Sequence, residues 1–324
     1  MIAAFAALTG ALLLQPQVVV DDFESVAGWR ATPSDDVSLT IGQDRGVSGR
    51  SMRLDFDFHG HGGYAVARRD VKLTLPANYE FTFSIRGDAP VNTLEFKLVD
   101  PSGDNVWWSN QRSFVFPPEW TKVTRKKRHI TFAWGPIGGG EMKEVAGLEI
   151  AITAGTGGKG TVWIDDLVLT PLPPQGEYNL TPKLTVGEDP RHRWLDIDFL
   201  QRREFGGLVI DWIERPPKYT VSMWSDGAAP TRVYEVGSSL RQRDYLYLPE
   251  SDARYVRVIF EGKPPLQSSP PFIGILKNVA VQPLAWSATM NDFFKAVAKD
   301  SPPGSYPRYF EDRQSYWNVI GVSG

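Results

Sequence analysis

Apolar and polar residues alternate with a period of two over most of residues 18–169. The clearest runs are residues 51–58 and 79–85, in which every second side chain is apolar. Such alternation is typical of strands with one face on a core and the other in solvent. Further candidate strands, separated by Gly, Pro, Asp and Ser turn signals, lie at residues 92–99, 121–130, 147–153 and 161–169. This spacing, without amphipathic helices between the strands, predicts an antiparallel β-sandwich or jelly roll.

A second series of strands follows a proline-rich break. Residues 172–177 read Leu-Pro-Pro-Gln-Gly-Glu and are predicted to form a stiff linker between domains at residues 18–171 and 178–284. The candidate strands of the second series are residues 193–199, 207–212, 219–224, 231–236, 244–248, 254–260 and 272–281. We therefore expect an all-β fold class, with two tandem antiparallel β-sandwich or jelly-roll domains.

The period changes after residue 284. Apolar positions follow a helical repeat within residues 285–300, and Thr289 with Asp292 makes a start that is similar to a capping box. The chain is thus expected to continue with one short helix and a tail. Because residues 301–324 carry more aromatic side chains than a free tail should, we expect them to open a further domain that this chain lacks.

The first 17 residues have a different character. Residues 2–14 are almost all apolar, which is about the length of a signal-peptide core and too short for a membrane-spanning helix. Residues 1–17 are predicted to be a signal peptide or signal anchor, with a misassigned start or an apolar first strand as the alternatives. The prediction is an exported protein that touches a membrane only if this segment stays uncleaved.

Composition excludes several classes of chemistry. The 324 residues include no Cys and only four His, so disulfides, thiolate metal sites and cysteine nucleophiles are absent and a His-rich metal centre is not expected. The net charge of −3 is far from the basic balance that nucleic-acid binding needs. Export without disulfides favours a bacterial periplasmic or extracellular setting.

The two ends of the first domain resemble a known family. Asp21-Asp22-Phe23-Glu24 opens it and residues 162–169, Val-Trp-Ile-Asp-Asp-Leu-Val-Leu, close it. This pair resembles the carbohydrate-binding modules of family 11 and their galactose-binding-like jelly-roll relatives. The resemblance implies a structural calcium ion (Ca²⁺) held by Glu24 and Asp165, with Asp22 as a weaker third ligand. Hard Ca²⁺ takes carboxylate and carbonyl oxygens, which such a site can supply.

The second domain resembles another family through four segments in order. Residues 194–199, 205–212, 219–227 and 253–258 look like the discoidin, or coagulation factor 5/8 type C, pattern. That family uses loops at one end of a jelly roll to bind sugars, and in some animal proteins phospholipid or protein. The terminal cysteine pair of the animal domains is absent here, and no apolar loop suited to a membrane stands out.

Candidate glycan contacts gather in the first domain. Sugar rings present apolar C–H faces, so a binding site needs aromatic platforms beside fixed hydrogen-bonding groups. Because adjacent strand residues face opposite ways, one of Trp107 and Trp108 is expected in the core and the other outside. The candidate platforms are Tyr64, Trp107, Trp108 and Trp134, and the candidate polar contacts are Arg68, Arg86, Asn92, Glu95 and Lys97.

Catalytic motifs are not found in a credible context, so no catalytic residue is named. The preferred hypothesis is non-catalytic binding of polysaccharide or oligosaccharide by two modules, which would hold an exported glycan-degrading enzyme against its substrate. The catalytic domain would follow this chain. The alternatives are a glycoside hydrolase or lyase in its own right, whose paired carboxylates no spacing would reveal, and a structural or adhesion module that binds a protein partner.

Overall fold

A computed structural model describes residues 16–174, 181–236 and 242–300. Residues 1–15 of the predicted signal segment, residues 175–177 of the linker and the predicted start of a further domain lie outside these residues. The chain divides into two compact units, Met1–Pro174 and Gln175–Gly324, and each is described by itself. Within the described residues no helix has the length and apolar character needed to cross a membrane.

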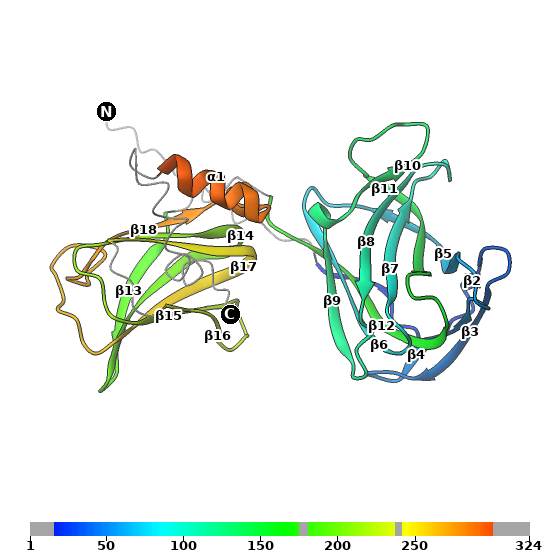
Figure 1. Ribbon diagram of the computed structural model, residues 1–324, viewed down its shortest axis with the longest axis horizontal. Coiled ribbons are helices and arrows are strands. Elements are labelled where there is room, and N and C mark those ends of the chain that lie inside the picture. The colour runs from blue at the N-terminus through cyan, green and yellow to red at the C-terminus, as the bar shows by residue number, and fades with distance from the viewer. Residues whose placement is uncertain (1–15, 175–180, 237–241, 301–324) are drawn as a thin grey trace, which may run out of the picture. The chain divides into compact units, whose positions relative to one another are not determined.

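The first unit contains two antiparallel sheets (Figure 1). The strands of the first sheet are β1 (Val18–Asp21), β3 (Ser38–Arg45), β4 (Arg50–Asp57), β6 (Tyr79–Asp88), β9 (Thr121–Lys126) and β12 (Lys159–Pro171). They are ordered β3-β4-β12-β6-β9, and β1 pairs with β12. The opening and closing strands of the unit, β1 and β12, are therefore neighbours.

The second sheet supplies the other layer of this unit. Its strands are β2 (Trp29–Ala31), β5 (Tyr64–Thr74), β7 (Asn92–Val99), β8 (Val106–Phe114), β10 (Thr131–Trp134) and β11 (Glu144–Thr153). They are ordered β10-β8-β7-β11-β5-β2. All pairs in both sheets are antiparallel, as the short spacing between strands predicts.

One core lies between the two sheets, and the period of two explains it. The alternate residues of β4 and β6, among them Phe81 and Phe83, are buried together with Phe96 of the facing β7. The ring centroids of Phe81 and Phe96 are 5.0 Å apart, and those of Phe83 and Phe96 are 5.9 Å apart. Each such ring contributes roughly 2 kcal/mol by leaving water, so these aromatics join the two layers.

The predicted strand at residues 121–130 is too long. Strand β9 ends at Lys126, and a 3-10 turn, Lys127–His129, follows it. The Lys126 amide donates to His129 Nδ1 at 3.2 Å, so a local side-chain contact ends the strand.

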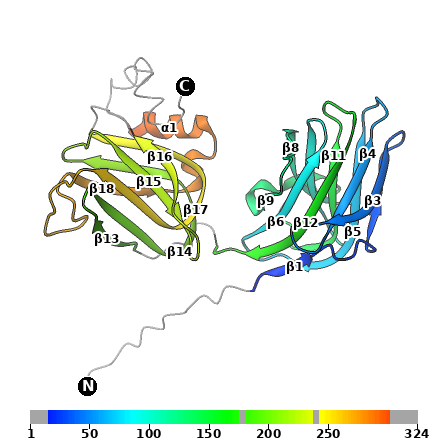
Figure 2. The same cartoon turned by 90° about the horizontal axis from the view of Figure 1, so that it is seen from below.

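The second unit contains one antiparallel sheet that bends around its own core. Its strands are β13 (Lys183–Glu188), β14 (His192–Trp212), β15 (Tyr219–Trp224), β16 (Thr231–Val236), β17 (Arg243–Glu261) and β18 (Leu276–Gln282). The order is β13-β14-β17-β15-β16, and β18 pairs with the second half of β14. Figures 1 and 2 show the long strands β14 and β17 side by side.

Two pairs of predicted strands are continuous in the structure. The predicted strands at residues 193–199 and 207–212 are both part of β14, and those at 244–248 and 254–260 are both part of β17. Pairing continues through the middle, for example between Phe205 and Ser251, and its register shifts on both sides of this region. Irregularities of this kind bend strands without ending them, so both halves enclose the same core.

The predicted helix is confirmed as α1 (Met290–Asp300). The Asp292 amide donates to the Thr289 hydroxyl at 3.1 Å, and that hydroxyl lies 2.7 Å from an Asp292 carboxylate oxygen. Phe293 and Val297 are buried in a small apolar cluster with residues of β14 and β17. The helix thus covers a sheet face in the second unit, and the all-β fold class with a short C-terminal helix is confirmed.

A buried carboxylate joins three parts of the second unit. Asp244, which is 1% exposed, accepts hydrogen bonds from Trp212 Nε1 at 2.9 Å, Arg215 Nε at 3.1 Å and the Tyr219 hydroxyl at 2.8 Å. Burial and the neighbouring carboxylate hold the pKa of Tyr219 well above its usual range, so this hydroxyl stays a donor.

Asp244→Asn should destabilise the second unit by about 3 kcal/mol, because it removes the buried negative charge that lies beside the Arg215 cation. Urea unfolding of the full chain, followed by tryptophan fluorescence, measures the change. Asp226→Asn is the matched control, since Asp226 pairs with Arg254 in an exposed setting and should change stability by less than about 1 kcal/mol. Equal effects of the two substitutions would contradict the role of Asp244.

Candidate functional site

The outward side of the second sheet carries an unusual set of side chains, which we call the open face. Cross-strand pairing aligns Arg68 of β5, Glu149 of β11, Lys97 of β7 and Trp108 of β8 in one row. The core side of the same strands carries buried apolar side chains such as Phe96. The members of the open face are Tyr64, Arg68, Glu95, Lys97, Trp108, Asn110, Trp134 and Glu149.

Ion pairs connect the centre of the open face. Lys97 Nζ lies 2.9 Å from Glu95 Oε2 and 3.9 Å from Glu149 Oε2, and Arg68 lies 2.9 Å from the other Glu149 oxygen. The side chains of Lys97 and Glu95 are only 8% and 5% exposed. Asn110 also donates to Glu95 at 2.8 Å. Buried charges must be paired in this way, and the pairing holds these side chains in place.

Aromatic rings lie around these charges. Trp134 and Tyr64 are 46% and 45% exposed, whereas Trp108 is half-buried. The Trp108 and Trp134 rings meet edge to face at 5.4 Å. Lys97 Nζ lies 5.5 Å from the Trp134 ring centroid and 5.8 Å from that of Tyr64. The open face therefore combines accessible flat rings with fixed donors and acceptors, an arrangement that can stack on a flat ligand and hydrogen-bond to its edge.

Six of the nine predicted contact residues lie together on this face. The prediction that one of Trp107 and Trp108 lies in the core and the other outside is confirmed. Trp107 is 4% exposed and packs on Phe132 in the core. The six are Tyr64, Arg68, Glu95, Lys97, Trp108 and Trp134.

Three predicted contact residues lie elsewhere. Trp107, in the core, donates to the carbonyl of Gly140 at 3.0 Å. Asn92 is fully buried, and its side-chain oxygen accepts from the amides of Gly155 and Gly157 at 2.8 and 2.9 Å. Both side chains hold the structure together and cannot reach a ligand on the open face.

Arg86 belongs to the other sheet of the first unit. It lies on β6, with its guanidinium carbon 4.2 Å from the Trp163 ring centroid and 5.3 Å from that of Trp120. Strand β6 pairs with β9 and β12, so Arg86 faces away from the second sheet. Arg86 is therefore not part of the open face, because sequence spacing does not say which sheet a strand joins.

Two members of the open face were not predicted. Glu149 and Asn110 complete the polar network. A signal for Glu149 existed, since it is the one charged residue in the apolar run at residues 147–153. A charge in such a strand needs a partner, but the partner could not be named without the pairing of β11 with β5 and β7.

The predicted calcium ligands lie around the turn at residues 46–50. Asp165, fully buried, accepts from the amides of Val47 and Ser48 at 2.8 and 3.4 Å. Glu24 accepts from the Arg50 amide at 2.9 Å. Two side chains that are far apart in sequence thus bind the same turn.

These carboxylates supply only part of a calcium shell. Asp22 is exposed, and its carboxylate accepts from the Glu24 amide at 3.2 Å. Among the described residues, no group of three or more His, Cys, Asp or Glu side chains gathers where it could hold a metal. Because Ca²⁺ takes six to eight oxygens, carbonyls of the turn would have to provide the rest, and calcium here stays a prediction.

Comparisons with known proteins give a likeness of fold. No protein-family model matches the chain, and no curated protein matches it. Among solved structures, the chain is similar to the family 11 carbohydrate-binding module of a cellulosomal cellulase of Clostridium thermocellum, at 15% identity and a TM-score of 0.40, over 48% of this chain and 95% of that one.

Two further solved structures match with similar sequence identities and TM-scores. A family 11 carbohydrate-binding module from Clostridium thermocellum in complex with a β-1,3-1,4-mixed-linked tetrasaccharide matches at 15% identity, with a TM-score of 0.40 over 48% of this chain and 95% of that one. An exo-β-agarase matches at 14% identity, with a TM-score of 0.37 over 49% of this chain and 26% of that one. The discoidin resemblance of the second unit stays a prediction.

Lys97→Met should destabilise the first unit by about 3–5 kcal/mol, because it leaves the buried Glu95 carboxylate without its cation. Lys122→Met on β9 is the matched control, since Lys122 is exposed and should change stability by less than about 0.5 kcal/mol. Thermal unfolding of the two variants at neutral pH measures the difference. Similar midpoints would show that the ion pairs do not hold the open face.

Asp165→Ala should cost about 2–3 kcal/mol, because it leaves the turn amides without an acceptor. Thermal midpoints in EDTA and in CaCl₂ test both roles of Asp165. If calcium binds, CaCl₂ raises the thermal midpoint of the unsubstituted chain but not that of Asp165→Ala. Asp22→Ala should lose a smaller part of this rise in the midpoint. Equal responses to CaCl₂ would remove the calcium prediction, and equal midpoints in EDTA would remove the role in holding the turn.

Proposed function

We propose that the first unit binds carbohydrate through the open face. The observation that carries this proposal is the presence of accessible Trp134 and Tyr64 rings beside a fixed network around Lys97. A pyranose ring has an apolar C–H face, which stacks on an aromatic ring, and hydroxyls at its rim, which need donors and acceptors held in place. The open face offers both within one row of strands.

The form of the face favours an extended glycan over a single sugar. Arg68, Glu149, Lys97 and Trp108 follow one another across four adjacent strands. Neighbouring strands are about 4.8 Å apart, so this row spans roughly the length of two or three sugar rings. Polysaccharide or oligosaccharide is therefore the proposed ligand class.

The proposed biological role is to hold a glycan-degrading enzyme against its polysaccharide outside the cell. Support for export is limited to the apolar stretch at residues 2–14 and the absence of cysteine. Support for a non-catalytic role is the lack of a recognisable catalytic motif in the sequence. Binding in this role can be weak at each contact, because an enzyme tethered to an insoluble substrate gains effective concentration.

Affinity electrophoresis of the full chain through gels that contain β-glucan, xylan, mannan or pectin tests the proposal. We expect at least one polysaccharide to retard the protein and Trp134→Ala to weaken that binding about tenfold, which corresponds to about 1.4 kcal/mol. The matched control is Trp120→Ala, since Trp120 contacts Arg86 of the other sheet and should leave retardation unchanged. Retardation that Trp134→Ala leaves unchanged, or retardation by none of the gels, would overturn the proposal.

A further inference from the structure

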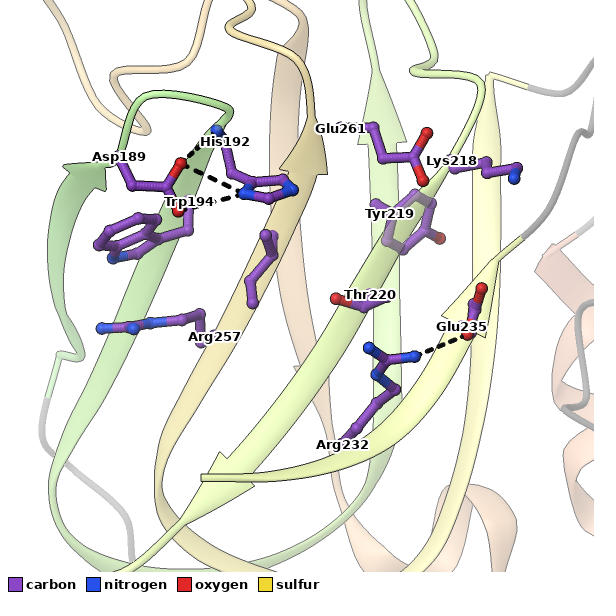
Figure 3. A pocket seen from close by; sticks show the side chains of 11 residues that line it. Asp189, His192, Trp194, Lys218, Tyr219, Thr220, Arg232, Glu235, Arg257 and Glu261 are labelled. Atoms are coloured by element: carbon purple, nitrogen blue, oxygen red, sulfur yellow. Dashed lines mark hydrogen bonds and ion pairs between the residues drawn. The ribbon is translucent and has the colours of Figure 1, made fainter. Parts of the chain in front are cut away.

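The second unit has a hollow of about 380 Å³ on the outward side of its sheet (Figure 3). Four lining residues form one row across four strands. Trp194 of β14 pairs with Ile259 of β17, Ile259 with Thr220 of β15, and Thr220 with Glu235 of β16. The core lies on the opposite side of these strands, where Val258 and Val221 are buried.

Side-chain size explains the hollow. Ile259 and Thr220 occupy the two central strands of the row, and both are partly exposed. Larger side chains flank them, with Trp194 on one side and the Arg232–Glu235 pair on the other. Short residues between long ones leave a space in the sheet face, and its volume is enough for one or two sugar rings.

The Trp194 wall is held in one position. Its indole lies against Gly187 on the neighbouring strand β13, where a Cβ would collide with the ring. The Arg257 guanidinium carbon lies 4.6 Å from the indole centroid, and Asp196 accepts from Arg257 Nε at 2.6 Å. The indole is thus fixed at the border of the hollow, with Arg257 over its ring.

The polar groups that line the hollow are paired with one another. Arg232 lies 3.0 Å from Glu235, and His192 Nδ1 lies 3.1 Å from Asp189 Oδ2. The backbone amides of Arg191 and His192 lower the pKa of Asp189 to about 2, so this carboxylate stays an acceptor near neutral pH. Figure 3 shows these two pairs on different sides of the hollow.

The remaining charged groups of the lining carry both signs. Lys218 and Glu261 add one charge of each sign to the lining, and the Arg257 cation is paired with Asp196. An ionic ligand would meet like charges as well as opposite ones, whereas a neutral ligand with many hydroxyls can use both donors and acceptors.

We propose that this hollow is a second binding site, which takes a neutral sugar ring against Trp194. The proposal rests on the proposed function of the chain, since it adds another contact for a glycan. It places the site on a sheet face, whereas the discoidin resemblance would place it in loops at one end of the sandwich. Two sites on one chain would raise the overall affinity for a polysaccharide by effective concentration.

Saturation-transfer NMR with single sugars tests the hollow without depending on the open face. The probes are glucose, galactose, mannose, xylose and N-acetylglucosamine, with galacturonate as the anionic comparison, and the protein is the full chain. Thr220→Lys fills the hollow, and Thr185→Lys is the matched control, because Thr185 is exposed on the same side of the sheet outside the lining. We expect at least one neutral sugar to show transfer that Thr220→Lys removes and Thr185→Lys preserves.

A second variant keeps the test valid if Thr220→Lys does not fold. Arg232 and Glu235 are exposed, so Arg232→Ala should leave stability nearly unchanged. It should weaken binding of the same sugar about fivefold, as expected for one lost hydrogen bond. The site would be overturned if neither variant changed transfer to any neutral sugar, or if only galacturonate responded. Trp134→Ala separates the two proposals, because it should weaken retardation in gels while leaving transfer at the hollow intact.

Discussion

The ammonium group of Lys97 is the charge on which the open face depends. It is almost completely removed from water, yet it lies on the side of the sheet that faces away from the core, between the carboxylates of Glu95 and Glu149. A cation in that position is tolerated only when its partners are also held. The same contacts that satisfy Lys97 therefore fix the donors and acceptors of the face and the rings of Tyr64 and Trp134 beside them.

The second unit reaches a similar combination by a different route. Its carboxylate Asp244 is buried in the core and joins Trp212, Arg215 and Tyr219, so its central charge stabilises the fold and is remote from solvent. On the outward side, short side chains leave a hollow whose charged groups are paired with one another. One unit thus presents exposed rings over buried ions, and the other presents a fixed indole beside paired polar side chains.

Much of the fold could be predicted because it depends on local pattern. Alternation identified most strands and separated Trp107 from Trp108, and the capping residues around Thr289 predicted α1. Errors arose where the chain bends without a turn signal, as in the middle of β14, and where a side chain rather than the backbone ends a strand, as at His129. The pattern along one strand contains no information about either event.

By itself the sequence determined which residues face inward or outward, the all-β class, the short helix and the chemical types available for a site. Only the tertiary structure decided which outward residues become neighbours. Arg68 and Glu149 are 81 positions apart yet form an ion pair, while Arg86, close in sequence to Lys97, lies on the other sheet. The physical reason is that the side a residue faces follows from the two-residue repeat of its own strand, whereas its cross-strand partners follow from the order and register in which distant strands pair.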